Sequence, residues 1–155
     1  MQSFCIVPRN GGLGYFVIHR LLQKRVQERA LRIPANTTIL SIPLHPRRRR
    51  ERGFNQSELI AAAIAQKFPL PLLPQTVLVR TRYTEPQAKV RGREARLNNM
   101  EGAFQVSHSM APLVNGKTIL LVDDIATTGN TLNEAARALK KAGASQVWGI
   151  VAAKG

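Results

Sequence analysis

The spacing of apolar positions along the chain changes repeatedly between two patterns, which predicts alternating helices and strands. Apolar residues recur every three to four positions, as in amphipathic helices, over residues 14–32, 55–68 and 131–144. Short apolar or alternating segments are typical of strands, and they occupy residues 37–44, 76–82, 102–106, 117–124 and 146–153. This order predicts an α/β fold with a mostly parallel central sheet flanked by helices.

One segment is predicted to lie at the centre of this sheet. Residues 117–124 are apolar on both faces until two aspartates, as expected for a strand that helices cover on both sides. The chain has 155 residues and shows no internal repeat and no linker, which predicts a single domain over residues 1–155. Residues 1–36 supply an N-terminal helix and residues 37–153 the core.

Two polar segments interrupt the apolar pattern. Residues 45–56 are predicted to form a charged loop, in which Phe54 serves as a buried anchor or, alternatively, as a surface for base stacking. The next helix is predicted to begin at Asn55 as its N-cap, with Glu58 completing a capping box. Residues 83–101 contain almost no apolar side chains, and so long a polar segment within one domain indicates a functional loop.

The charge of the chain is large and uneven. It carries 23 Lys and Arg against 9 Asp and Glu, a net +14, of which residues 1–97 hold +13. Such a field attracts polyanions, which include nucleic acid, diphosphate groups and anionic lipid, although a basic surface can also serve solubility alone.

The cysteine content and the hydropathy exclude several classes of protein. The single cysteine, Cys5, excludes a disulfide framework and disfavours a cysteine-based zinc site, which favours a reducing, cytoplasmic setting. No apolar run approaches the roughly 18–20 residues of a membrane span. The first residues also lack the pattern of a secretory signal.

The segment ILLVDDIATTGNT, residues 119–131, carries the clearest chemistry. A buried strand leads into Asp123 and Asp124 and then into a loop that feeds a helix N-terminus. Ligands of open parallel sheets bind beyond the carboxyl ends of the strands. Backbone N–H groups and the helix dipole suit a phosphate, whereas carboxylates accept hydrogen bonds from sugar hydroxyls or hold Mg²⁺. A sugar phosphate satisfies both halves of the segment.

Other interpretations of this segment fit less well. A Walker A site requires G-x-x-x-x-G-K-[ST], which the chain lacks, and a dinucleotide fold requires a strand before the glycines at residues 11–14. Phospho-acceptor signalling domains also carry paired aspartates after a strand, but not the T-T-G-x-T loop. A purely structural role would leave two buried carboxylates without partners, at a high cost in free energy.

Three segments carry a resemblance to known families. LLVDDIATTGNT (120–131) resembles the phosphoribosyl-diphosphate signature of type I phosphoribosyltransferases. IPLHPRRRRERGFNQSELIA (42–61) and TRYTEPQAKVRGREARLNNMEGAF (81–104) are similar to the ComF, or GntX-like, family of competence and DNA-utilisation proteins. The resemblance implies a type I phosphoribosyltransferase-like core, glycosyltransferase activity on a pentosyl group, Mg²⁺ as cofactor and a link to DNA uptake.

The sequence departs from the family pattern near its start. Members of the family commonly begin with a four-cysteine, zinc-finger-like segment, and the single Cys5 implies that this chain lacks it. About 36 residues precede the first core strand, which implies a minimal hood over the site.

The resemblance also assigns roles to individual residues. Asp123 and Asp124 would hold the ribose hydroxyls and, directly or indirectly, Mg²⁺. The turn at Pro43, Leu44 and His45 would meet the diphosphate, and residues 83–101 would close over the site. The 5′-phosphate would bind to Ala126, Thr127, Thr128, Gly129, Asn130 and Thr131.

Departure of diphosphate from C1 of ribose leaves an oxocarbenium-like centre, so catalysis needs cations near the leaving oxygens. Arg80 and Arg82 are the catalytic candidates for this role, with Arg91 and Arg93 in the polar loop as further sources of charge.

A binding module is the alternative to an enzyme. Five arginines can grip a diphosphate or the backbone of single-stranded DNA, namely Arg47, Arg48, Arg49, Arg50 and Arg52. An enzyme explains the acidic pair, whereas a DNA-binding module explains the excess charge of residues 1–97. The expected partners are phosphoribosyl diphosphate, single-stranded DNA in the alternative, and other competence or DNA-uptake proteins.

Overall fold

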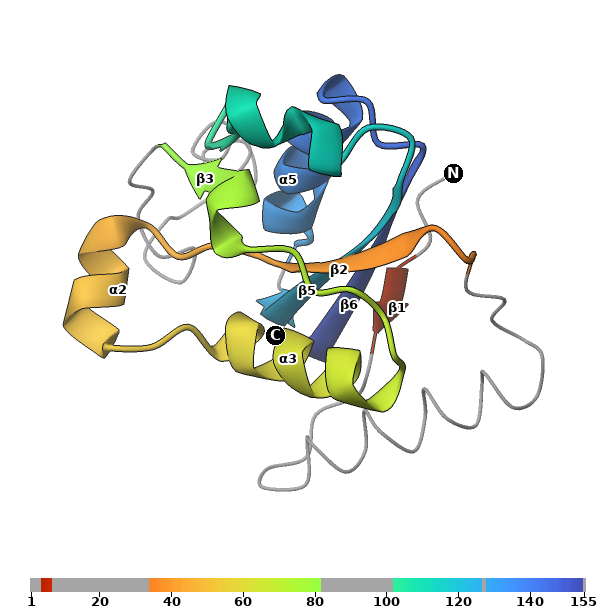
Figure 1. Ribbon diagram of the computed structural model, residues 1–155. Helices are drawn as coiled ribbons and strands as arrows, with labels where there is room; N and C mark the ends of the chain where they lie inside the picture. Colours follow the sequence, from red (N-terminus) through yellow and green to blue (C-terminus); the bar gives the residue numbers. More distant parts are fainter. Residues whose placement is uncertain (1–3, 7–33, 82–101, 127, 155) are drawn as a thin grey trace.

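A four-stranded parallel sheet forms the centre of the structure, a computed structural model that describes residues 4–6, 34–81, 102–126 and 128–154 (Figure 1). The strands lie in the order β1-β6-β5-β2. β5 pairs in parallel with both β2 and β6, so the strand with two apolar faces is an interior one, as the sequence predicts. The bounds are Phe4–Ile6 for β1, Thr37–Ser41 for β2, Thr118–Ala126 for β5 and Gln146–Lys154 for β6.

Helices cover both faces of the sheet. α3 (Gln56–Lys67) lies on one face and packs Ile64 into a core cluster beneath it. α5 (Asn130–Lys141) lies on the opposite face, where Leu139 joins the larger core cluster (Figure 1). The predicted fold class, a mostly parallel sheet flanked by helices, is therefore confirmed.

A short antiparallel hairpin lies on the same face as α5. It joins β3 (Leu78–Arg80) to β4 (Phe104–Val106) and contributes to the larger cluster. The 3-10 helices η1 (Gln75–Val77) and η2 (His108–Leu113) flank it. The strand predicted over residues 76–82 is therefore shorter than expected, because η1 takes its first residues.

The basic segment that the sequence predicts as a loop is largely helical, so that prediction was wrong. α2 runs over Pro46–Arg52, with His45 as its N-cap and Gly53 in the left-handed conformation after its last residue. Arginine has a high helix propensity, and Arg47 pairs with Glu51 one turn later, at 3.1 Å. These local signals outweigh the mutual repulsion of the arginines.

Two further predictions lie outside the described residues. These are the helix over residues 14–32 and the polar loop over residues 83–101. Within the described part of the chain, no helix is long and apolar enough to cross a membrane.

Candidate functional site

The carboxyl ends of β2 and β5 separate at one edge of the sheet, and this separation builds the site. β2 ends at Ser41, opposite Val122, and the last regular bond runs from Ile42 N to Val122 O at 2.8 Å. A regular parallel ladder would continue from the N–H of Asp124 to the carbonyl oxygen of Ile42. That oxygen instead accepts from Asn55 Nδ2 at 2.9 Å. β5 therefore continues without β2 beside it.

Ser57 occupies the place left open beside β5. Its Oγ donates to Asp123 Oδ1 and accepts from the N–H of Asp124, both at 3.1 Å. The same N–H lies 2.9 Å from Asp123 Oδ1. Asn55 caps α3, since its Oδ1 accepts from Ser57 N at 3.2 Å. The first turn of α3 is thus tied directly to the two aspartates.

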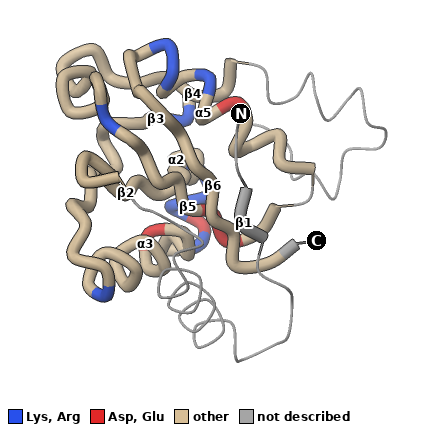
Figure 2. Tube along the Cα trace, turned by 90° about the vertical axis from the view of Figure 1, so that its right-hand side faces the viewer, with Lys and Arg blue, Asp and Glu red and all other residues tan. Residues whose placement is uncertain are grey.

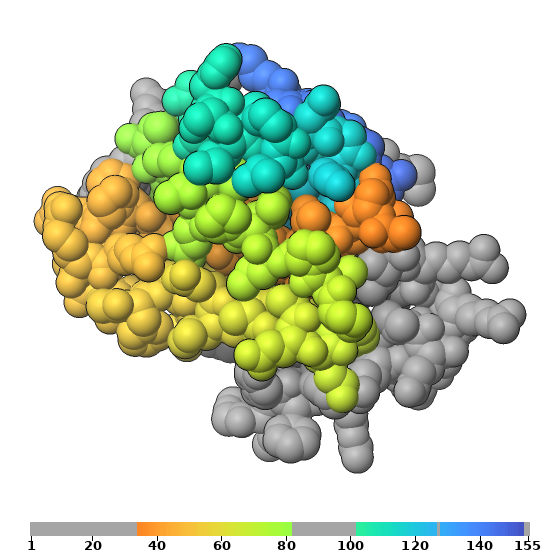
Figure 3. Space-filling view, viewed as in Figure 1, coloured from red at the N-terminus to blue at the C-terminus, as the bar shows by residue number. Residues whose placement is uncertain are grey.

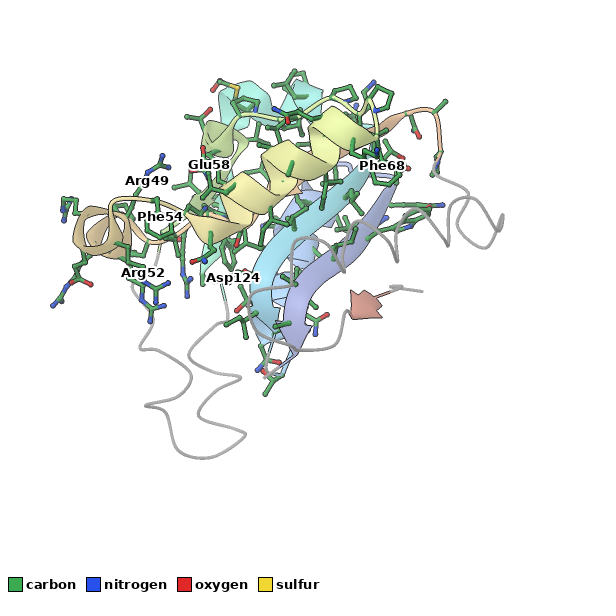
Figure 4. The ribbon with its side chains drawn as sticks, turned by 90° about the horizontal axis from the view of Figure 1, so that it is seen from below. Arg49, Arg52, Phe54, Glu58, Phe68 and Asp124 are labelled. Atoms are coloured by element: carbon green, nitrogen blue, oxygen red, sulfur yellow. The ribbon has the colours of Figure 1, made fainter. Side chains whose placement is uncertain are left out.

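The two aspartates differ in exposure. Asp123 is 6% exposed, whereas Asp124 is partly exposed below the start of α3 (Figure 4). Burial, followed by the negative charge of Asp124, raises the pKa of Asp123 to about 7. Burial and the neighbouring charge thus favour the neutral form of Asp123. The sequence predicts that the strand ends at the two aspartates. β5 instead continues to Ala126, so both aspartates lie within the strand.

The chain after β5 presents a helix end suited to an anion. Gly129 has a φ of +75° and N-caps α5, and among the described residues no side chain caps this end. The first turn of α5 carries no acidic residue, so its N–H groups can receive a negatively charged group. Four other predicted phosphate ligands lie in this region: Ala126 ends β5, Thr128 is exposed, and Asn130 and Thr131 begin α5. Thr127 lies outside the described residues.

Two cationic side chains, Arg80 and Arg48, lie near the aspartates, and Figure 2 shows basic and acidic segments close together near β5. Arg80 is 9% exposed and its guanidinium lies 5.4 Å from the centre of the Phe104 ring. Burial, then the charge of Arg48, lowers the pKa of Arg80 to about 10, and the charge of Asp123 opposes this. An anion between the two guanidinium groups would relieve their repulsion. Arg82 lies outside the described residues.

The predicted diphosphate turn leads into this group of cations. Pro43 is buried, whereas Leu44 and His45 are partly exposed. His45 Nδ1 accepts from the N–H of Arg47 at 3.3 Å, so the imidazole caps α2. Partial burial, followed by the positive charges of Arg80 and of three arginines of α2, lowers the pKa of His45. The lowered pKa favours the neutral imidazole, whose Nδ1 can accept the hydrogen bond of the cap.

The arginines of α2 differ in their partners. Arg49 contacts Gln75 Oε1 and lies 3.5 Å from Glu58 Oε2, so Glu58 faces Arg49 and does not complete the predicted capping box. Arg50 and Arg52 are exposed and form no hydrogen bond or ion pair among the described residues. α2 projects from the edge of the molecule (Figure 3), and Arg52 lies on the side of Asp124, away from Arg49 and Glu58 (Figure 4).

Phe54 is 51% exposed, so its predicted role as a buried anchor was wrong. The anchor of this segment is its neighbour Asn55, which is 2% exposed and bonds to Ile42 and Ser57. Successive residues of an extended segment point in opposite directions, so the inward turn of Asn55 sends Phe54 outward.

The sequence interpretation assigns Asn55 a capping role alone and assigns Ser57 none. A signal for Ser57 was available, because the buried positions of α3 are Ser57, Ala61 and Ile64, which follow helical spacing. A serine on the apolar stripe of a helix is a buried polar group that needs a partner. The partner itself, Asp123, is 66 residues away and is not visible in local periodicity.

The donor set fits Mg²⁺ that arrives with a phosphate ligand. The described residues contain no group of three His, Cys, Asp or Glu side chains that could hold a metal ion alone. Mg²⁺ commonly binds through one or two carboxylates together with phosphate oxygens of the substrate. The adjacent Asp123 and Asp124, near the start of α5 and the guanidinium of Arg80, meet that requirement.

Comparison with known proteins identifies the domain. Residues 55–154, from the cap of α3 to the end of β6, match the phosphoribosyl transferase domain. The chain belongs to this family. Its relatives place it in the ComF-like branch, as the sequence resemblance predicts. It is 31% identical over 138 residues to competence protein F of Haemophilus influenzae, and 36% identical over 133 residues to the DNA utilization protein YhgH of Salmonella typhi.

This phosphoribosyl transferase domain corresponds to part of each of those relatives. The matches cover 86% and 83% of this chain but 59% and 56% of the two relatives. Competence protein ComFC of Bacillus subtilis is 35% identical over 105 residues, which are 68% of this chain and 39% of that protein. The chain thus spans less than two thirds of the length of these relatives.

Solved structures share the fold of this phosphoribosyl transferase domain. The allosteric regulatory enzyme of purine biosynthesis matches with a TM-score of 0.51 and 18% identity, over 83% of this chain and 24% of that one. Glutamine phosphoribosylpyrophosphate amidotransferase from Bacillus subtilis matches with the same score and identity, over 80% of this chain and 24% of its own. These likenesses support the predicted type I phosphoribosyltransferase fold.

Proposed function

We propose that this protein binds phosphoribosyl diphosphate with Mg²⁺ at the carboxyl edge of β5 and acts as a phosphoribosyltransferase in DNA uptake or utilisation. The observation that carries the proposal is that three groups gather at this edge: the open end of α5, the aspartate pair, and Arg80 with Arg48. Phosphoribosyl diphosphate carries three groups that suit them: the 5′-phosphate, the ribose hydroxyls and the diphosphate. The names of the relatives, competence protein F and DNA utilization protein, support the biological setting.

Each group of the chain has a distinct task in this proposal. The N–H groups at the start of α5 take the 5′-phosphate. Asp124, the more exposed aspartate, accepts hydrogen bonds from the ribose. The buried Asp123 supports Asp124 from the preceding position in β5. Mg²⁺, when bound by these carboxylates, would neutralise charge on the diphosphate oxygens. The cytoplasmic setting that the single cysteine favours belongs to the same proposal.

Arg80 is suited to stabilise the departing diphosphate. Its guanidinium sits against the Phe104 ring and is largely withdrawn from water, so its position is set before the ligand binds. A fixed positive charge in a partly water-excluded site stabilises developing negative charge without reorganisation. Arg48 adds a second positive charge beside it.

Calorimetric titration of Mg²⁺–phosphoribosyl diphosphate tests the proposal. The wild type is expected to bind with a Kd of about 1 μM, that is about 8 kcal/mol, and Asp123→Asn is expected to show no binding. Glu51→Gln, which removes one carboxylate charge from the exposed α2, is the matched control and should bind like the wild type. Absence of binding by the wild type would contradict the proposal and leave the motif as scaffold.

Single-stranded DNA is a second candidate ligand, and one observation favours it. Exposed Phe54 lies two residues after Arg52 and four after Arg50, and neither arginine forms a hydrogen bond or ion pair among the described residues. An exposed aromatic ring beside exposed cations is the combination by which proteins bind single strands, with bases on the ring and phosphates on the cations. In this second proposal the protein binds DNA on α2, beside the sugar-phosphate site.

The double variant Arg50→Ala/Arg52→Ala tests DNA binding with a labelled oligothymidine. We expect affinity at about 50 mM salt to fall about tenfold and the slope against log salt to flatten by between one and two, since two phosphate contacts are lost. Lys67→Ala/Lys117→Ala removes the same charge from exposed positions outside α2 and is the control. Equal effects of the two double variants would assign the binding to net charge and not to α2.

A further inference from the structure

We propose that Ser57 is a positioning residue of the acidic pair, whose hydroxyl holds the Asp123 carboxylate and the backbone at Asp124 in the arrangement that receives the ligand. The identity of that ligand rests on the proposed function. The positioning role itself rests on the contacts of the chain alone.

The hydroxyl of Ser57 acts in both directions at once. It donates to Asp123 Oδ1 and accepts from the N–H of Asp124, each at 3.1 Å, so a single oxygen fixes a side chain and a backbone group of β5. Asp123 Oδ1 also lies 2.9 Å from that N–H. A rotation of the Asp123 carboxylate would break both of its contacts, which restricts it to one orientation.

Water is a poor substitute for this hydroxyl. Ser57 is 3% exposed and Asp123 is 6% exposed, so bulk solvent has little access to either side chain. Loss of the hydroxyl would leave a buried carboxylate with one donor fewer, and a buried acceptor that loses its donor bears a large desolvation cost. The carboxylate would then turn toward other donors or toward solvent.

The position of Ser57 is in turn set by β2. Asn55 bonds to Ile42 O with its Nδ2 and to Ser57 N with its Oδ1, at 2.9 and 3.2 Å. A chain of contacts therefore runs from the end of β2 through Asn55 and Ser57 to the aspartates. The Ser57 hydroxyl takes the place of the β2 carbonyl that a regular ladder would present to Asp124.

A role confined to helix stability does not account for these contacts. Serine at the start of a helix usually bonds to the backbone of its own helix. The two bonds of the Ser57 hydroxyl instead reach Asp123 and Asp124, 66 and 67 residues along the chain. Asn55 already serves as the N-cap of α3, so the hydroxyl is available for the site.

The test compares Ser57→Ala, Ser57→Thr and the control Ser145→Ala in two measurements. Ser145 Oγ donates to Lys117 O at the opposite end of the sheet, at 2.9 Å, so its removal deletes a hydrogen-bonding hydroxyl away from the site. The first measurement is the NMR shift of the Asp123 side-chain carboxyl carbon and of the Asp124 amide in the free protein. The second is the affinity for Mg²⁺–phosphoribosyl diphosphate.

Ser57→Ala is expected to move both NMR signals and to weaken binding by about 10- to 100-fold, the usual effect of one hydrogen bond to a charged group. Ser57→Thr should restore both, and Ser145→Ala should change neither. Unmoved signals in Ser57→Ala would overturn the positioning role, as would moved signals with wild-type affinity. If the wild type does not bind this ligand, the proposed function fails, and the signals of the free protein still decide the role of Ser57.

Discussion

Asp123→Asn is expected to resist unfolding more strongly than the wild type above neutral pH, although it removes the residue on which ligand binding depends. Burial raises the pKa of Asp123 to about 7 in the folded protein, against an ordinary value of 3.8. Below about pH 4 the carboxyl is protonated whether the chain is folded or not. Between about pH 4 and about pH 7 the unfolded chain ionises while the folded protein keeps the proton, so the stability falls as the pH rises. Above about pH 7 the folded protein also carries the buried negative charge beside Asp124, and the loss is complete.

Urea unfolding at about pH 5 and about pH 8.5 measures this effect. The asparagine keeps the oxygen that accepts from Ser57 and from the N–H of Asp124, but it never ionises. The gain of the variant over the wild type should therefore grow between the two pH values, by as much as a few kcal/mol. Titration of groups distant from Asp123 is common to both proteins and cancels. Parallel pH dependences would contradict the buried, raised-pKa carboxyl.

The second large effect is expected from Asn55→Ala, which should lower the free energy of unfolding by about 3 kcal/mol. The substitution removes the N-cap of α3, a loss of about 1 kcal/mol. It also leaves the buried carbonyl oxygen of Ile42 without the donor that now lies at 2.9 Å, which costs a further 1–3 kcal/mol or so. Asn55 is 2% exposed, so water cannot easily replace either bond.

A second variant separates the two contributions of this side chain. Asn55→Asp keeps an oxygen to cap Ser57 N but has no donor for Ile42 O, so it should lose most of the stability that Asn55→Ala loses. Gln56→Ala alters the exposed neighbour and should change stability by about 0.5 kcal/mol or less. Urea unfolding of the set provides the values. A wild-type stability for Asn55→Asp would show that the cap alone matters.

The sequence predicted the parts of the fold that depend on local patterns. The run from Ile119 to Val122 is apolar at every position, and a strand covered on both faces requires this, so an interior place in a parallel sheet followed directly. The likeness of residues 120–131 to the phosphoribosyl-diphosphate signature led to the family that the domain comparison shows. Both signals are local, since they lie within residues 119–131.

The parts that the sequence did not predict depend on contacts between distant segments. Phe54 and Asn55 differ in burial because Asn55 bonds to Ile42, which lies before α2 in the chain, and no local pattern reports that bond. The pairing of Ser57 with Asp123 joins two elements that are adjacent in the fold but far apart in the chain. Helix α2 was not predicted for another reason: a run of four arginines indicates mutual repulsion, whereas the helix depends on the His45 cap and the Arg47–Glu51 pair.

Helix α2 also bears on how proteins of this kind can diverge. The helix lies wholly within the described residues, and none of its residues is buried. The bond from Asn55 to Ile42 joins the two ends of the segment that contains it. Substitutions or insertions between His45 and Phe54 can therefore alter the charge presented to an anionic partner at little cost to folding. Selection can change the surface charge of α2 while the aspartates of β5 stay constant. Homologous proteins can therefore acquire different partners without substitutions in the core.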